Sequence, residues 1–286
     1  VLTCSLSDNN SIRITGSGRN TCILDGGGTT QIFSIITSQK NEDVSISDLT
    51  LKNGYTGQNG GALNVQVQAA DITLENIQIC DSETTGGESV AGGAVCSSET
   101  GTVAVKSCGF YRNASAGNVG GLYIATSSGN GELVNCVFED NNVNNTGGSE
   151  YYGDGGGAMF YSGSTSTGYI SGNTFTGNSA SGGSNPDGGG LMTYQLGADS
   201  VLTLDGNSFQ NNTAGLDGGG CILRFNNTGN KILVTQNAFK NNTAGTRSGA
   251  GLYLYINNGD LTYSGNTHSG NQANGSVMGR GAGAEI

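Results

Sequence analysis

The chain has 286 residues, of which 52 are Gly, one is Pro and none is Trp. Its 11 Lys and Arg against 22 Asp and Glu give a net charge of −11. So much Gly excludes a helical bundle, the single Pro excludes collagen, and the acidic charge disfavours nucleic acid as a partner. No apolar run approaches the roughly 20 residues of a membrane span, so none is expected.

Short segments in which apolar and polar residues alternate recur along the whole chain, as is typical of β-strands. In chain order they include residues 22–24, 44–46, 49–51, 72–74, 103–105, 201–204 and 232–234.

A pair of small residues followed by an apolar run, as in Gly156-Gly157-Ala158-Met159, recurs eight times. The second small residue of each copy lies at positions 61, 93, 121, 157, 190, 220, 251 and 283. Between the pairs, an aromatic residue is followed three places later by Asn. The good copies are Phe110 with Asn113, Phe138 with Asn141, Phe175 with Asn178, Phe209 with Asn212 and Phe239 with Asn242.

A repeat of about 32 residues with two or three short strands cannot bury its apolar face alone, so the repeats must stack. The sequence predicts an all-β chain with a single domain over residues 1–286, a right-handed parallel β-helix of about ten coils. Residues 1–43 are its less regular N-terminal coils and 44–286 the regular repeats. The handedness follows from the general rule for parallel connections. Equivalent residues should then form columns, with the Phe residues stacked and the Asn residues in an amide ladder.

The two motifs together resemble the repeats of the chlamydial polymorphic outer-membrane protein family and of related extracellular β-helix proteins. The resemblance covers about residues 44–286. Members of that family are surface-exposed passengers and adhesins, so the resemblance implies a secreted or cell-surface setting.

The spacing of the acidic residues does not indicate catalytic chemistry, because these residues are scattered over the expected strands. The only His, His268, occupies the position that Phe has in other repeats. One acidic group is ordered, because Asp154, Asp187 and Asp217 each lie three residues before the second Gly of a pair. These residues should form one column. Three roles are open for them. The side chains cap their own Gly turns, they bind a calcium ion, which is the one candidate cofactor, or they act in catalysis.

Seven Cys leave at least one thiol unpaired. Cys108 and Cys136 fall in one column, two residues before successive Phe positions, where a disulfide is feasible. Cys4 and Cys22 are a second candidate pair, and Cys96 and Cys221 are expected as buried apolar filler.

Seven Asn-x-Ser/Thr sequons are candidate glycosylation sites in a secretory setting. They begin at Asn9, Asn113, Asn144, Asn211, Asn226, Asn241 and Asn274.

The strand after each Gly pair is apolar on both faces. With its first and third residues inward, an outward apolar strip remains as the candidate binding surface. Its members are Tyr123, Met159, Tyr161, Met192, Tyr194, Ile222, Tyr253 and Tyr255, and Leu63 and Val95 precede them. Three occupants are open: the chain's own loops, another protein chain, or glycans stacked on the rings.

These observations favour a non-enzymatic extracellular or cell-surface protein of structural or adhesive function. Its partners would be other copies of itself, another surface protein or glycans, and its coils could assemble end to end into a fibre. The alternative is a polysaccharide-binding or polysaccharide-degrading β-helix protein.

Overall fold

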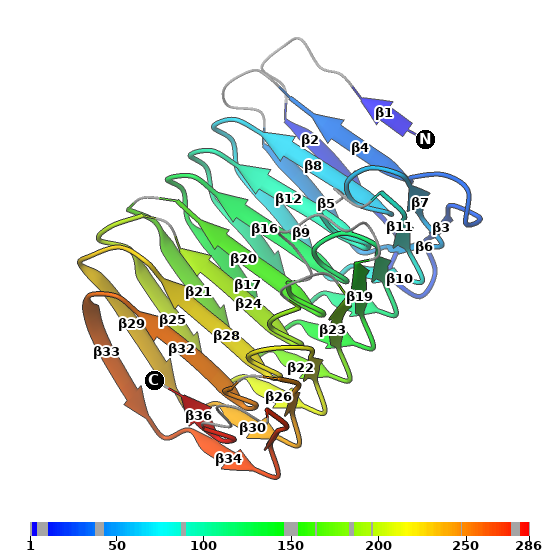
Figure 1. The fold of residues 1–286 in the computed structure, drawn as a ribbon. Coiled ribbons are helices and arrows are strands. Elements are labelled where there is room, and N and C mark those ends of the chain that lie inside the picture. The colour runs from blue at the N-terminus through cyan, green and yellow to red at the C-terminus, as the bar shows by residue number, and fades with distance from the viewer. Residues whose placement is uncertain are drawn as a thin grey trace.

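A computed structural model describes residues 2–4, 11–37, 43–86, 90–145, 154–163, 165–182, 186–195, 197–246, 248–275 and 281–285 of the chain. Every regular element within these ranges is a β-strand, and the strands pair in parallel into four sheets. The described part is therefore an all-β parallel solenoid, in which the chain winds from the N-terminal to the C-terminal end (Figure 1). It contains no helix with the length and apolarity of a membrane span.

Two of the sheets carry the longer strands. Sheet A contains β1 (Leu2–Cys4), β4 (Phe33–Ile36), β8 (Leu63–Val67), β12 (Ala94–Ser98), β16 (Leu122–Thr126), β20 (Ala158–Ser162), β24 (Leu191–Gln195), β28 (Cys221–Phe225), β32 (Leu252–Ile256) and β36 (Ala284–Glu285). Sheet B contains β2 (Ile12–Thr15), β5 (Val44–Ser47), β9 (Ile72–Glu75), β13 (Val103–Lys106), β17 (Gly131–Val134), β21 (Thr167–Ser171), β25 (Val201–Asp205), β29 (Asn230–Thr235) and β33 (Gly259–Ser264).

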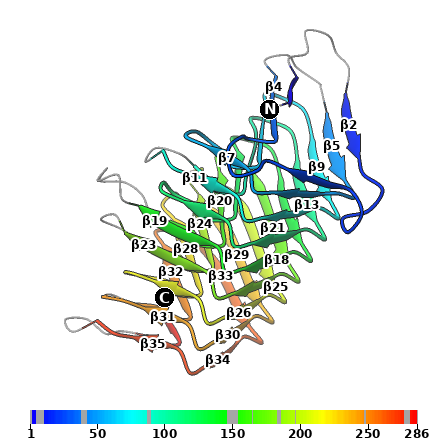
Figure 2. The same cartoon turned by 90° about the vertical axis from the view of Figure 1, so that its right-hand side faces the viewer.

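The other two sheets are built from shorter strands. Sheet C contains β3 (Ile23–Asp25), β6 (Thr50–Lys52), β10 (Gln78–Cys80), β14 (Gly109–Tyr111), β18 (Val137–Glu139), β22 (Thr174–Thr176), β26 (Ser208–Gln210), β30 (Ala238–Lys240) and β34 (Thr267–Ser269). Sheet D, whose strands follow one another along one side in Figure 2, contains β7 (Tyr55–Thr56), β11 (Glu83–Thr84), β15 (Ala114–Ser115), β19 (Asn142–Asn145), β23 (Ser179–Gly182), β27 (Thr213–Ala214), β31 (Thr243–Ala244) and β35 (Gln272–Ala273).

One turn of the solenoid visits the sheets in the order A, B, C and D. In the described residues about eight turns, from β4 to β35, contain a strand of every sheet. The expectation of about ten coils was therefore too high, because it counted the incomplete turns of β1 to β3 and of β36. Each turn also has four strands rather than two or three, since most sheet D strands have only two residues and leave no alternation to recognise.

The corners on either side of sheet C are uniform. From β5 onward two residues separate each sheet B strand from sheet C, and two separate sheet C from sheet D. The first corner residue has positive φ, as Asn76 (52°) and Asn211 (56°) illustrate, and the second points into the core. Asn, Asp and Gly, which tolerate positive φ, hold most of the first positions. The corner geometry thus places equivalent residues of successive turns in one column.

The predicted aromatic column is confirmed. Phe110, Phe138, Phe175, Phe209 and Phe239 are buried and stack with ring centroids 4.7–5.0 Å apart. His268 continues the stack at 4.8 Å from Phe239, and its Nε2 lies 2.5 Å from the Tyr263 hydroxyl. His268 therefore packs in the aromatic column, at the position of a Phe residue that its place in the repeat predicted.

The predicted amide ladder is confirmed beside the Phe column. The Nδ2 of Asn178 donates to the carbonyl of Phe138 (2.9 Å) and to Oδ1 of Asn212 (2.9 Å). Its own Oδ1 accepts the backbone N–H and the side-chain amide of Asn141, both at 3.0 Å. Each buried amide therefore satisfies backbone groups of neighbouring turns. The ladder runs through Asn113, Asn141, Asn178, Asn212, Asn242 and Asn271.

A second ladder lines the corner between sheets B and C. It comprises Asn173, Asn207, Asn237 and Asn266, and Cys136 and Cys108 continue it toward the N-terminus. The Cys136 thiol reaches the carbonyl of Val105 (3.5 Å), much as Asn173 Nδ2 reaches that of Leu133 (2.8 Å). Its sulfur also accepts the N–H of Cys108 at 3.4 Å. Cys136 thus makes the contacts of a ladder Asn, and burial raises the pKa of its thiol well above the usual value.

The expected disulfides are not formed in the structure. Cys108 and Cys136 do share a column, but both are free thiols that hydrogen-bond to backbone carbonyls. Cys22 is also a free thiol, so it is not linked to Cys4, whose side chain lies outside the described residues. Cys96 and Cys221 are buried in the apolar core, as expected.

The choice of inward face for sheet A is confirmed from β12 onward. From β12 to β32 the first and third residues of these strands are buried, and all except Thr193 belong to one core cluster with the Phe column. Leu63 was wrongly placed outward, because it pairs with Ala94 and lies fully buried on the inner face. The first Gly pair is offset by one residue from the later copies, and such an offset exchanges the two faces of a strand.

Differences in repeat length are concentrated at the corner between sheets D and A. This connection contains six residues between β7 and β8 but twelve between β19 and β20. At the end of this connection the backbone runs close to the backbone of the next turn, since a Cβ on Gly157 would meet the carbonyl oxygen of Gly190. Close backbone approach, rather than positive φ, therefore explains most of the repeated Gly pairs.

Replacing Asn178 by Ala should lower the free energy of unfolding by about 2–4 kcal/mol. The change leaves the Phe138 carbonyl and the Asn141 N–H buried without partners, at about 1–3 kcal/mol for each group. Urea denaturation measures the loss. Asn144→Ala, at an exposed position, should stay within about 0.5 kcal/mol of the wild type, and equal effects of the two changes would refute the ladder's role.

Cys136→Asn should preserve stability within about 1 kcal/mol, because the new amide can donate to Val105 and accept from Cys108 as its neighbours in the column do. Cys136→Ala, which removes both bonds, should destabilise the chain by about 1–3 kcal/mol. Thermal unfolding of the two variants under reducing conditions distinguishes them. If the Asn variant were the less stable, the thiol would not be acting as a ladder member.

Candidate functional site

The outer face of sheet A carries two columns of side chains. One, which we call the covered file, consists of Asn64, Val95, Tyr123, Met159, Met192, Ile222 and Tyr253. The other, which we call the outer file, consists of Ile36, Gln66, Ser97, Ala125, Tyr161, Tyr194, Arg224 and Tyr255. The predicted apolar strip is thus divided between two columns with different environments.

Much of the covered file is buried by the chain itself. Met192 is 1% exposed and Ile222 is 0% exposed, so their prediction as exposed binding residues was wrong. The turns before each Gly pair fold over them: a Cβ on Gly188 would lie 2.9 Å from that of Met192, and one on Gly218 2.8 Å from that of Ile222. Both glycines also have positive φ. Of the three predicted occupants, the chain's own loops cover this part of the strip.

Residues of the turns also pack over the covered file further toward the N-terminus, where they form a small second hydrophobic core. Val95 packs with Ala91 and Val119, and the partly buried Tyr123 and Met159 lie against this cluster. Tyr123, Met159 and Tyr253 keep part of their surface exposed.

The outer file lies at the surface. Tyr161 and Tyr194 are partly exposed, and their rings are nearly parallel, at 14°, with centroids 6.4 Å apart. The side-chain amide of Asn226 donates to the Tyr194 hydroxyl at 3.2 Å, which fixes that ring. Tyr255 is 46% exposed. These three tyrosines remain candidate binding residues, and Arg224 lies between the last two.

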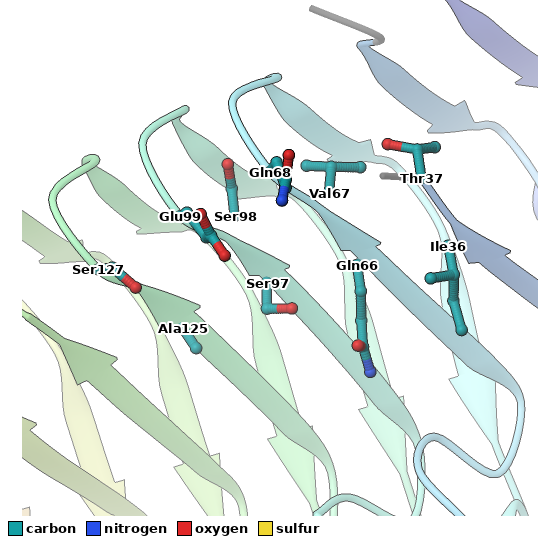
Figure 3. Close-up of a pocket in the computed structure, with 10 residues that line it drawn as sticks. All are labelled: Ile36, Thr37, Gln66, Val67, Gln68, Ser97, Ser98, Glu99, Ala125 and Ser127. Carbon is teal, nitrogen blue, oxygen red and sulfur yellow. The ribbon is translucent and has the colours of Figure 1, made fainter. Parts of the chain in front are cut away.

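A shallow groove of about 270 Å³ lies over the N-terminal half of the outer file, and we call it the Ser97 groove. It forms where the file has short side chains, Ser97 and Ala125, between Gln66 and the tyrosines. The close-up in Figure 3 shows Gln66, Ser97 and Ala125 following one another along neighbouring strands. The lining residues are Ile36, Thr37, Gln66, Val67, Gln68, Ser97, Ser98, Glu99, Ala125 and Ser127. This groove was not predicted from the sequence, although the short Ser97 and Ala125 at outward positions were a readable signal.

The acidic residues form the predicted column at the turns that cover sheet A. Asp217 donates its backbone N–H to Asp187 Oδ1 (3.0 Å), and Ser248 donates its own to Asp217 Oδ1 (2.7 Å). The carboxylates of Asp187 and Asp217 therefore cap the equivalent turn of the next coil rather than their own Gly turns. Asp187 is 0% exposed, and its Oδ2 accepts a hydrogen bond of 2.6 Å from the Arg224 guanidinium.

The N-terminal member of this column, Asp154, has a strongly raised pKa. Burial and, to a smaller extent, the neighbouring Asp187 carboxylate together raise the pKa of Asp154 to about 7, against a smaller opposing effect of Arg224. The Oδ1 of Asp154 is buried and has no hydrogen-bond partner. Burial also raises the pKa of Asp187, although Arg224 opposes the shift. The guanidinium of Arg224 thus interacts electrostatically with all three carboxyl groups of the column.

A calcium site is not supported by the positions of these carboxyl groups. The described residues contain no group of three His, Cys, Asp or Glu side chains arranged to hold a metal ion. Both oxygens of Asp187 and the Oδ1 of Asp217 are instead engaged with backbone N–H groups and Arg224.

The predicted glycosylation sites fall into different environments. Asn113 is buried and belongs to the amide ladder, so its side chain is inaccessible in the folded chain and that prediction was wrong. Asn226 is partly buried and bonded to Tyr194. Asn9 lies outside the described residues. The remaining candidates, Asn144, Asn211, Asn241 and Asn274, are exposed.

Comparison of the chain with protein-family models, with curated proteins and with solved structures gives no match. The candidate site therefore rests on its own geometry.

Asp154→Asn should stabilise the protein at pH 8 but not at pH 4. The folded-state pKa of about 7 exceeds the ordinary 3.8, so the wild type loses stability as pH rises between these values. The variant should gain on the order of 2–4 kcal/mol at pH 8, and the gain should shrink below about 0.5 kcal/mol at pH 4. Urea denaturation across this range measures it. Asp260→Asn, at an exposed position, is the control, and a gain that does not change with pH would contradict the assignment.

Proposed function

We propose that this chain is a non-enzymatic extracellular or cell-surface protein of structural or adhesive function, with the outer face of sheet A as its binding surface. The right-handed winding expected from its parallel connections is part of the proposal. The single observation that carries it is the outer file, in which eight turns present side chains in one continuous row.

The construction of the core supports a structural role. Two amide ladders and a Phe column connect successive turns through buried hydrogen bonds and stacked rings. A solenoid is stabilised chiefly by contacts between neighbouring repeats, so such connections favour a stiff rod. A stiff rod keeps the residues of the outer file in register over its length.

The composition of the outer file supports a role in adhesion. Aromatic side chains that are only partly buried are enriched at recognition surfaces, because a ring offers a large contact area at low entropic cost. Tyr161, Tyr194 and Tyr255 are three such rings in one column. The resemblance of the repeats to those of surface-exposed adhesins agrees with this assignment.

The alternative, a polysaccharide-binding or polysaccharide-degrading protein, is favoured by a different observation, the polar Ser97 groove. Polysaccharide binding is compatible with an adhesive function. Polysaccharide degradation would need carboxyl groups free to react, whereas Asp187 uses one oxygen for the Asp217 N–H and the other for Arg224.

End-to-end assembly into a fibre remains a prediction from the sequence. Negative-stain electron microscopy of the purified chain at several salt and calcium concentrations tests it, and uniformly monomeric particles would contradict it.

Beads coated with the protein should adhere to surfaces that carry extracellular material, and the outer file should be responsible. A panel of immobilised matrix proteins, mixed cell-wall glycans and the protein itself serves as the target. The double change Tyr161→Ala with Tyr194→Ala should reduce bead retention under flow at least about fivefold, because it removes both rings of the pair.

Tyr169→Ala is the matched control for that assay. Tyr169 is a 41% exposed tyrosine on sheet B, outside the outer file, so its removal should leave retention unchanged. Retention no greater than that of albumin-coated beads on every surface would refute the proposed function. Equal losses from the control and the double change would refute the assignment to the outer face of sheet A.

A further inference from the structure

We propose that the Ser97 groove and the adjoining tyrosines form one binding site for a neutral polysaccharide chain that lies parallel to the solenoid axis. This inference rests on the proposed function, because it names the ligand class of the same face.

The direction of the ligand follows from the shape of the site. The groove crosses neighbouring strands of sheet A rather than running along one of them, since it is lined by β4, β8, β12 and β16 and the residues after them. Tyr161 and Tyr194 continue the same column on the next two strands. A linear polymer that contacts both parts would therefore cross the strands.

The spacing of the site suits a sugar polymer. Neighbouring strands lie about 4.8 Å apart, which is close to the length of one sugar unit in an extended polysaccharide. An extended peptide would instead be expected to pair with the edge of a sheet, where backbone groups are unpaired, rather than to cross a sheet face.

The chemistry of the groove also suits a carbohydrate. The lining combines hydroxyl groups of Ser97 and Ser127, the amide of Gln68 and a few apolar side chains. These hydroxyl and amide groups can donate hydrogen bonds to the hydroxyl groups of a sugar and accept hydrogen bonds from them.

The charge of the site selects a neutral ligand over an anionic one. Of the ten residues that line the groove, Glu99 is the single charged one, and it is negative. The cation of the outer file, Arg224, is already paired with the buried Asp187. The chain as a whole has a net charge of −11. Acidic polysaccharides would therefore meet repulsion along the site, whereas neutral ones would not.

Affinity electrophoresis of the purified chain tests the inference. The gels contain hydroxyethylcellulose, xyloglucan, galactomannan, soluble β-1,3-glucan or starch, with polygalacturonate as the acidic comparison. We expect retardation by at least one neutral polysaccharide and none by polygalacturonate. Two changes should each weaken binding at least about tenfold: Tyr161→Ala combined with Tyr194→Ala, which removes the rings, and Ala125→Trp, which fills the groove.

Two control variants exclude loss of fold as the cause. Tyr169→Ala removes an exposed ring from sheet B, and Thr203→Trp adds one at a partly exposed position of β25. Both should bind like the wild type, and all variants should keep the circular dichroism spectrum and thermal midpoint of the wild type.

The outcomes separate this inference from the proposed function. Retardation by no neutral polysaccharide, while coated beads still adhere through the outer file, would overturn the ligand class and leave the adhesive function standing. Binding that survives both the tyrosine changes and Ala125→Trp would overturn the location. Binding to polygalacturonate alone would overturn the selection for neutral chains.

Discussion

Between its first and last turns, a core side chain of this solenoid has counterparts in the turns before and after it, at the spacing of neighbouring strands, about 4.8 Å. This in-register stacking decides which residues each column can hold. Rings and amides benefit from it: Phe138 stacks on both neighbours, and Asn178 bonds to the turn on either side. The ladders therefore both satisfy buried polar groups and define the register of the turns.

The same spacing is unfavourable for like charges. Asp154, Asp187 and Asp217 stand in consecutive turns, and their repulsion is offset by backbone N–H groups and by one guanidinium, that of Arg224. The arrangement engages Asp187 completely and leaves Asp154 with a pKa near 7. A column of carboxyl groups, which suggested calcium or catalysis in the sequence, is here part of the turns that cover sheet A.

The parts of the structure that could be predicted depend on spacing along the chain. The Phe and Asn columns were predictable because two-residue corners on both sides of sheet C keep Phe175 and Asn178 at fixed places in every turn. Burial of Met192 and Ile222 was not, because it depends on the direction in which the turns fold across the sheet, and the spacing of their residues does not show that direction. The inward position of Leu63 depended on a one-residue offset. The Ser97 groove arises from short side chains in successive turns, a relation visible only once the register is known.

The corner between sheets D and A carries connections of six to twelve residues, unlike the two-residue corners on either side of sheet C. Because the uniform corners hold the ladders, extra residues at this corner leave the core columns unchanged. Loop length there can therefore vary without loss of the fold, since closing a longer loop costs little additional entropy. The corner is a natural place for grafting foreign peptides, and a rod of this kind could display several of them in a row, one per turn.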